Sequence, residues 1–120
     1  MFFGVFYWVI DSNRVYSSSS SLHLKLWIMD TWLKVMQEEI IPFQVAKGMV
    51  IAGSFRGEDN DSVYVWIRRF ESEAERERLY DEVYGSDYWK EDVSPRLSSM
   101  LNREAMVVTR LIPTEMSILQ

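Results

Sequence analysis

The sequence has no cysteine and a single histidine, His23. The absence of cysteine excludes disulfides, thiolate nucleophiles, iron–sulfur clusters and cysteine-ligated zinc sites. With one histidine, any histidine-based triad or histidine-ligated metal site has to use His23. We therefore expect no metal site and no cofactor, and composition alone removes most standard catalytic machinery.

Positive charge is also scarce, since 13 Lys and Arg face 18 Asp and Glu for a net charge of −5. A nucleic-acid partner needs a surplus of positive charge, and so does an anionic membrane surface. We expect neither as the main partner. The length of 120 residues corresponds to one domain.

Long apolar runs are missing as well, because the longest, Met1–Ile10, is shorter than the 17–25 residues or so that a spanning helix needs. No Lys or Arg precedes Arg14, so the segment does not have the basic start of a secretory signal. We expect no membrane span and a cytoplasmic location, or the mitochondrial matrix in a eukaryote. The β-branched and aromatic residues favour either an extra strand or a poorly packed leader.

Four strands are predicted from the hydrophobic pattern. Segment 49–56 is predicted as a strand, 57–61 is rich in turn residues and 62–70 alternates with period two, which together predict a hairpin of strands 49–56 and 62–70. We expect a strand over 15–26 before this hairpin, and a last strand over 104–112.

Helices are predicted between these strands. Apolar residues at helical spacing after an N-cap at Asp30 predict a first helix, interrupted at Pro42 and ending at Gly48. Ser72 and Glu75 form a capping box for a second helix. Short helices over 87–92 and 95–101 follow it.

The order strand–helix–strand–strand–helix–strand is the ferredoxin-like split βαβ arrangement. We predict an α+β fold in which an antiparallel sheet carries its helices on one face. The other face would be bare, and we expect Tyr64 and Trp66 to lie on it. Because such a face is costly to leave in water, a second copy should cover it in an obligate homodimer.

A set of short segments in a fixed order is the most specific feature of the sequence. These are Ile41-Pro42-Phe43-Gln44, Gly48-Met49, Gly53-Ser54-Phe55, Tyr64-Val65-Trp66, Arg69-Phe70-Glu71-Ser72, Ala74-Glu75-Arg76-Glu77, Ser86-Asp87-Tyr88-Trp89, Pro95 and Pro113. The set resembles the NIPSNAP family over residues 30–113. That family is similar to the dimeric α+β barrels, in which two ferredoxin-like subunits press their sheets together and enclose a small cavity in each subunit.

The resemblance implies a domain at 15–113, an apolar N-terminal extension at 1–14 and a C-terminal tail at 114–120. The first strand of the family tends to carry a Glu-x-Arg-x-Tyr type of pattern. This chain has serines at the equivalent positions, within the run Ser17–Ser21. If those family side chains line the cavity, this chain has lost them.

Tyr64, Trp66 and Arg68 are the main candidate site residues, because alternation puts them on one face of their strand. Either they line a ligand pocket in which Arg68 holds an acidic or carbonyl group, or they pack in the dimer interface. Arg56 and Arg110 are expected on neighbouring strands and could add to the same charge.

Three functions are compatible with these residues. The first is a small-molecule-binding or cofactor-independent enzymatic barrel, with His23 as a further pocket residue or a base. The second is a non-catalytic interaction or adaptor module, which the run of serines favours. The third is haem binding through His23. We predict the first, because the aromatic strand face favours a pocket, with a small organic ligand and a second copy of the chain as partners.

Overall fold

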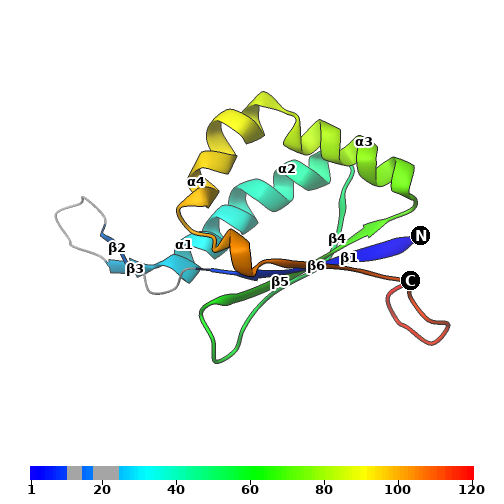
Figure 1. The fold of residues 1–120 in the computed structure, drawn as a ribbon, viewed down its shortest axis with the longest axis horizontal. Coiled ribbons are helices and arrows are strands. Elements are labelled where there is room, and N and C mark those ends of the chain that lie inside the picture. The colour runs from blue at the N-terminus through cyan, green and yellow to red at the C-terminus, as the bar shows by residue number, and fades with distance from the viewer. Residues whose placement is uncertain (11–14, 18–24) are drawn as a thin grey trace.

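A four-stranded antiparallel sheet forms one layer of the protein, and the helices form the other. The computed structural model describes residues 1–10, 15–17 and 25–120, with side chains described for 1–10 and 28–120. The strands are β1 (Phe2–Val9), β4 (Val50–Arg56), β5 (Val63–Phe70) and β6 (Val107–Leu111), in the order β4-β5-β1-β6. The helices lie over one face of this sheet (Figure 1). The topology is the predicted ferredoxin-like α+β fold.

The first strand of the sheet is β1 and not the segment 15–26. β1 pairs with β5 from Phe2 to Val9, and its other edge pairs with β6. The expected N-terminal extension therefore contains a central strand. Within 15–26, the structure describes β2 (Val15–Ser17) and part of β3 (Lys25–Trp27), which pair with each other in a separate sheet.

The apolar character of β1 explains its central place. Phe2, Phe6 and Trp8 are buried on the side of the helices. The opposite face of the strand carries Phe3, Val5 and Tyr7, so apolar residues occupy both faces and the sequence reads as a continuous apolar run. His23 and most of the serine run lie outside the described residues.

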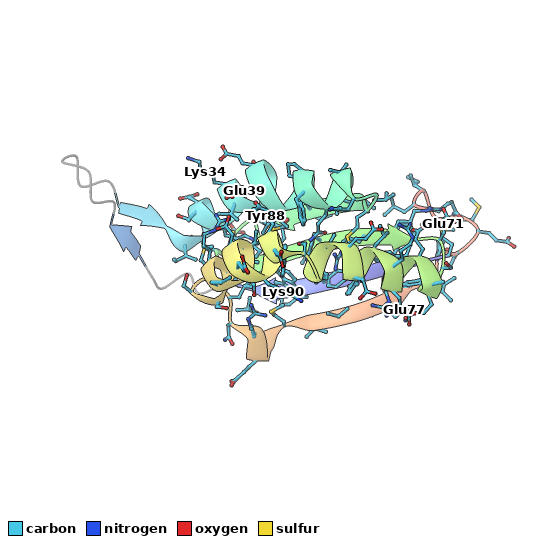
Figure 2. The ribbon with its side chains drawn as sticks, turned by 90° about the horizontal axis from the view of Figure 1, so that it is seen from above. Lys34, Glu39, Glu71, Glu77, Tyr88 and Lys90 are labelled. Atoms are coloured by element: carbon cyan, nitrogen blue, oxygen red, sulfur yellow. The ribbon has the colours of Figure 1, made fainter. Side chains whose placement is uncertain are left out.

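Two helical runs cross the sheet side by side (Figure 2). The first consists of α1 (Ile28–Val35), the π-helical η1 (Met36–Ile40) and α2 (Ile41–Ala46). The second consists of α3 (Glu73–Tyr84), the π-helical η2 (Tyr88–Val93) and α4 (Ser94–Ser98), and a short 3₁₀ turn, η3 (Arg103–Ala105), leads into β6. Among the described residues, no helix has the length and apolarity to cross a membrane.

Each π-helical segment comes directly before a proline. Pro42 is in the first turn of α2, just after η1, and Pro95 is in the first turn of α4, just after η2. Proline has no N–H and its ring collides with the carbonyl four residues earlier. The wider π turn accommodates that collision without ending the run, so the interruption predicted at Pro42 is a change of helix type.

The helix ends agree with the sequence prediction at two places and differ at a third. The Ser72 Oγ accepts a hydrogen bond of 3.1 Å from the Glu75 backbone N–H, which confirms the predicted N-cap of α3. Gly48 has a φ of 107°, the left-handed conformation that ends a helix. Asp30 is not an N-cap, because α1 already begins at Ile28.

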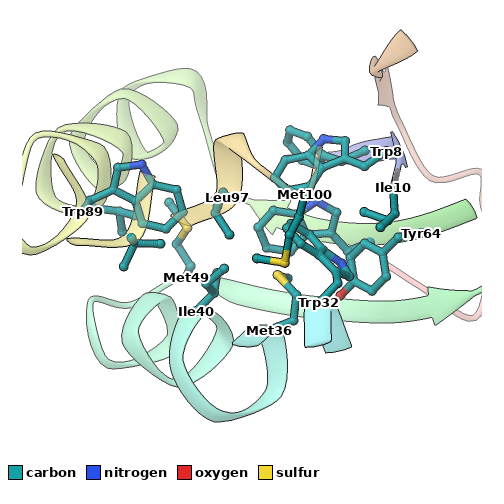
Figure 3. Close-up of a cluster of buried hydrophobic side chains, with 14 of the residues drawn as sticks. Trp8, Ile10, Trp32, Met36, Ile40, Met49, Tyr64, Trp89, Leu97 and Met100 are labelled. Atoms are coloured by element: carbon teal, nitrogen blue, oxygen red, sulfur yellow. The ribbon is translucent and has the colours of Figure 1, made fainter. Parts of the chain in front are cut away.

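An aromatic core fills the space between the sheet and the helices (Figure 3). The ring centroid of Trp8 lies 5.1 Å from that of Trp66 and 5.6 Å from that of Trp32. The ring centroids of Trp32 and Tyr64 are 5.7 Å apart. Tyr64 and Trp66 are fully buried here. The expectation that they lie on the bare face is therefore wrong. Both alternating sets of β5 are apolar enough to face a core, so alternation did not show which set the helices cover.

A bidentate ion pair between Arg96 and Glu39 joins the two helical runs at the surface. The Arg96 guanidinium donates to both carboxylate oxygens of Glu39, at 2.8 and 2.9 Å. These hydrogen bonds lower the pKa of Glu39 despite some desolvation. The Tyr88 hydroxyl lies 3.5 Å from a carboxylate oxygen of Glu39, and Figure 2 shows the two residues as neighbours.

Deletion of residues 1–9 should abolish cooperative folding, because it removes a strand that is paired on both edges and takes Phe6 and Trp8 out of the core. Urea unfolding followed by circular dichroism would measure this. A chain that lacks residues 114–120 is the control, and we expect it to unfold in one cooperative transition. A cooperative transition in the chain lacking residues 1–9 would contradict the central role of β1.

Candidate functional site

Arg68 is a charged residue in the middle of the apolar layer. It lies on β5 between Trp66 and Phe70, on the face that the helices cover, and its side chain is 1% exposed. Burying a guanidinium is costly unless its N–H groups find acceptors. The residues around Arg68 are therefore the first place to look for a site.

Four side chains from three parts of the chain accept hydrogen bonds from Arg68. Nη1 donates to Gln44 Oε1 at 3.0 Å, to the Tyr84 hydroxyl at 2.7 Å and to Met49 Sδ at 3.3 Å. Nη2 donates to the Tyr80 hydroxyl at 2.9 Å. Gln44 also donates through Nε2 to the Tyr84 hydroxyl at 3.4 Å, which closes a small network.

Aromatic rings surround the guanidinium. Its central carbon lies 4.2 Å from the Phe6 ring centroid, 4.4 Å from that of Trp66 and 5.1 Å from that of Tyr80. Cation–π attraction at these distances offsets part of the lost hydration. Among the residues that the structure describes, no carboxylate forms an ion pair with Arg68. Within this part of the chain, hydrogen-bonding dipoles and aromatic rings hold the cation.

The tyrosine at the centre of this network is held in its neutral form. Desolvation raises the pKa of the Tyr84 hydroxyl, and the nearby charge and hydrogen bond of Arg68 oppose that rise in part. Near neutral pH, Tyr84 therefore accepts from Arg68 with its oxygen and keeps its own proton.

A pocket of about 450 Å³ opens beside Arg68, between the sheet and the second helical run. Its volume is in the range typical of small-molecule sites. Most of the wall is aromatic or aliphatic, and Trp89 belongs to it. The lining residues are Phe6, Trp8, Arg68, Arg76, Tyr80, Tyr84, Trp89, Ser94, Leu97, Leu101, Arg103, Met106 and Val108.

The pocket lining offers few of the side chains that hydrolysis or metal binding uses. Its lining contains no Asp, Glu or His. In the described part of the chain, no group of three or more His, Asp or Glu side chains is placed to hold a metal ion. What the lining offers is an apolar enclosure, three guanidinium groups and the hydroxyls of Tyr80, Tyr84 and Ser94.

Solved structures share this architecture over nearly the whole chain. An uncharacterised NIPSNAP domain protein from Burkholderia xenovorans superposes with a TM-score of 0.71 at 14% identity, covering 98% of each chain. A NIPSNAP family protein from Agrobacterium tumefaciens superposes with a TM-score of 0.70 at 20% identity, covering 100% of each chain. The chain has the NIPSNAP fold.

A structure that is not of a NIPSNAP protein also shares this fold. An antibiotic biosynthesis monooxygenase superposes with a TM-score of 0.61 at 11% identity, covering 95% of this chain and 99% of the other. No family model matches the sequence, and no curated protein matches it. At these identities the likeness concerns the fold, and the fold implied by the sequence resemblance is confirmed.

Within the NIPSNAP fold, Arg68 lines the pocket, and the other three predicted site residues that the structure describes do not. Tyr64 and Trp66 lie beneath it in the core, where the Tyr64 and Ser54 hydroxyls share a hydrogen bond of 2.5 Å. Arg56 is exposed at the end of β4. The fifth, His23, lies outside the described residues.

Arg56 and Arg110 do not combine their charges as expected. They lie on β4 and β6, which are the two opposite edges of the sheet. Arg110 instead forms an ion pair of 2.6 Å with Glu73 and covers the Phe2 ring. The expectation treated β4 and β6 as neighbours, whereas β5 and β1 lie between them.

Sequence reasoning missed the partners of Arg68. Tyr80 and Tyr84 follow the capping box of the second predicted helix with no local sign of a hydrogen-bonding role, and Gln44 belongs to one of the segments that resemble the family. The spacing of four residues does place both tyrosines on one face of α3. It could have indicated a pair of hydroxyls, but the acceptor role depends on Arg68, which approaches from another element.

Replacing Tyr84 by Phe should lower the free energy of unfolding by about 1–3 kcal/mol, because a buried cation loses a hydrogen-bond acceptor. Urea denaturation measures the change. Tyr88→Phe is the matched control, since its exposed hydroxyl lies 3.5 Å from Glu39, and we expect a change within about 0.5 kcal/mol. Equal effects of the two substitutions would mean that the Tyr84 hydroxyl does not support Arg68.

Proposed function

We propose that this chain is a NIPSNAP-type protein that binds a small organic molecule in the pocket between the sheet and the second helical run. The observation that carries the proposal is the aromatic-walled pocket of about 450 Å³ with the buried Arg68 in its wall. Apolar enclosure supplies affinity, and a few placed polar groups supply orientation.

The same pocket suits a reaction that needs no cofactor. Tyr80 and Tyr84 hold their hydroxyl oxygens against Arg68, so their O–H groups are positioned by a fixed donor. A neutral phenol placed in this way is able to donate a hydrogen bond to a bound carbonyl or enolate oxygen. Enzymatic turnover is therefore part of the same proposal, with these two hydroxyls as the groups that touch the substrate.

The pocket can be tested by filling it from its rim. Val108 lines the pocket and is 58% exposed, so an indole at this position would enter the pocket without disturbing the core. We expect Val108→Trp to weaken binding of N-phenyl-1-naphthylamine, a neutral fluorescent probe, about tenfold or more. Val108→Ala is the control that leaves the pocket open. Equal probe affinity in both variants would contradict the proposed site.

A homodimer completes the proposal, because the face of the sheet opposite the helices is apolar. The register places eleven apolar side chains on it: Phe3, Val5, Tyr7, Val9, Val50, Phe55, Val63, Val65, Ile67, Val107 and Leu111. Phe55 is 56% exposed and Val107 is 54% exposed. A large apolar patch of this kind marks an interface.

A second copy of the chain suits this face for energetic reasons. Burying one large apolar side chain contributes about 1.5–3 kcal/mol, and association costs about 4–15 kcal/mol. Burial of most of these eleven residues on both subunits would outweigh that cost. The interface is self-complementary in a two-fold dimer, and it is the pairing that the NIPSNAP resemblance implies.

The dimer is tested by a charge placed on this face. Val107→Glu should convert a dimer into a monomer, because two carboxylates would be buried without partners. Val45→Glu is the matched control, since Val45 is 51% exposed on the helical layer. Light scattering coupled to gel filtration measures the mass. A folded wild-type monomer at micromolar concentration would contradict the dimer.

A further inference from the structure

The charge of the pocket has the opposite sign to the charge of the protein. The whole chain carries a net charge of −5, whereas the charged residues that line the pocket are Arg68, Arg76 and Arg103, with no Asp or Glu among them. Arg68 is the buried one, and Arg103 is exposed. A cleft lined by one sign of charge raises the local concentration of ligands of the other sign.

Arg68 keeps unused hydrogen-bonding capacity. An arginine side chain has five N–H groups. Oxygens of Gln44, Tyr80 and Tyr84 accept from Nη1 and Nη2. Nε is buried and donates to no atom of the described residues. Nε lies on the guanidinium edge with which arginine binds carboxylates side on.

A second buried donor belongs to the same pocket. Trp8 lines it, and the Trp8 Nε1 is also buried without an acceptor among the described residues. A buried donor without an acceptor costs free energy. Trp32 and Trp66, which do not line the pocket, also leave their Nε1 without an acceptor among the described residues. The unpartnered Nε of Arg68, a charged lining residue, is therefore the observation that points to a ligand with acceptor oxygens.

The buried cation is not needed for stability in general. Replacing a buried charged group and its partner by apolar residues is often neutral or stabilising. A position on β5 among Phe6, Trp66 and Phe70 would suit an apolar side chain. A guanidinium there, beside a pocket, places a positive charge where a bound ligand is able to use it.

We propose that the pocket binds a small organic carboxylate with an aromatic or aliphatic body, an inference that rests on the proposed ligand-binding function. The negative charge of the carboxylate lies beside the Arg68 guanidinium, and the apolar body lies against Tyr84, Trp89 and Leu97. Arg76 is paired with Glu73, so the exposed Arg103 is the lining cation that favours the approach of the anion from solvent. A monovalent head group suits this wall, because only one of the three arginines is buried.

Matched pairs of ligands test the charge requirement without altering the protein. Benzoate, indole-3-acetate and decanoate are each compared with their primary amides by isothermal titration calorimetry. A hydrogen-bonded charge contributes enough that at least one carboxylate should bind about 10- to 100-fold more tightly than its amide. Inorganic phosphate is the third probe, and we expect it to displace the bound carboxylate poorly.

Variants then assign the preference to one residue. Arg68→Gln should remove the preference for the carboxylate, while Arg69→Gln should keep it, since Arg69 lies on the opposite face of the same strand. Arg103→Gln, at an exposed position, should weaken carboxylate binding and reduce its salt dependence, and it keeps the test decisive if Arg68→Gln does not fold.

Each other outcome overturns a defined part of the proposal. Equal affinities for carboxylates and amides would overturn the carboxylate inference and leave the pocket as a neutral-ligand site. Phosphate that competes as well as the carboxylate would overturn the assigned head group. Failure of all these ligands and of N-phenyl-1-naphthylamine to bind would overturn the proposed function as well.

Discussion

The buried guanidinium of Arg68 is the interaction on which the arrangement of the layers depends. Its donors reach Gln44 on α2, Met49 before β4, and two tyrosines on α3. One side chain of β5 thereby links the sheet to both helical runs. Because a cation in an apolar layer tolerates few alternative surroundings, these bonds favour one relative placement of helices and sheet over others of similar apolar contact. The pocket lies beside this link and takes its polar character from it.

The two faces of the sheet meet different requirements. The face under the helices combines aromatic packing with a polar network. The opposite face carries aliphatic and aromatic side chains with little polar content, and its alternating residues on β5 are half-buried. A single chain of 120 residues has too few helices to cover both faces. The architecture thus separates a face that can hold a ligand from a face that can hold another copy of the chain.

Local sequence signals predicted local features well. The hairpin of β4 and β5 and the N-cap at Ser72 depend on residues close together in the chain, and both are confirmed. The assignment of the first strand is wrong because the apolar run at 2–9 has no polar alternation to identify it as a strand of this sheet. Of the candidate site, Arg68 was identified from its strand position, and its acceptors on α2 and α3 were not, since no local pattern connects residues 24 and 16 positions apart.

The sequence by itself determined the fold class, the order of the later strands and helices, and the absence of cysteine and histidine chemistry from most of the chain. These follow from periodicity, turn residues and composition, which act over a few residues. Only the tertiary structure decided which face of β5 the helices cover, and hence that Tyr64 and Trp66 belong to the core. It also decided that three arginines from β5, α3 and η3 line one pocket. Both outcomes depend on packing between distant segments, because the burial of a side chain is a property of what lies above it and not of its own neighbours in the chain.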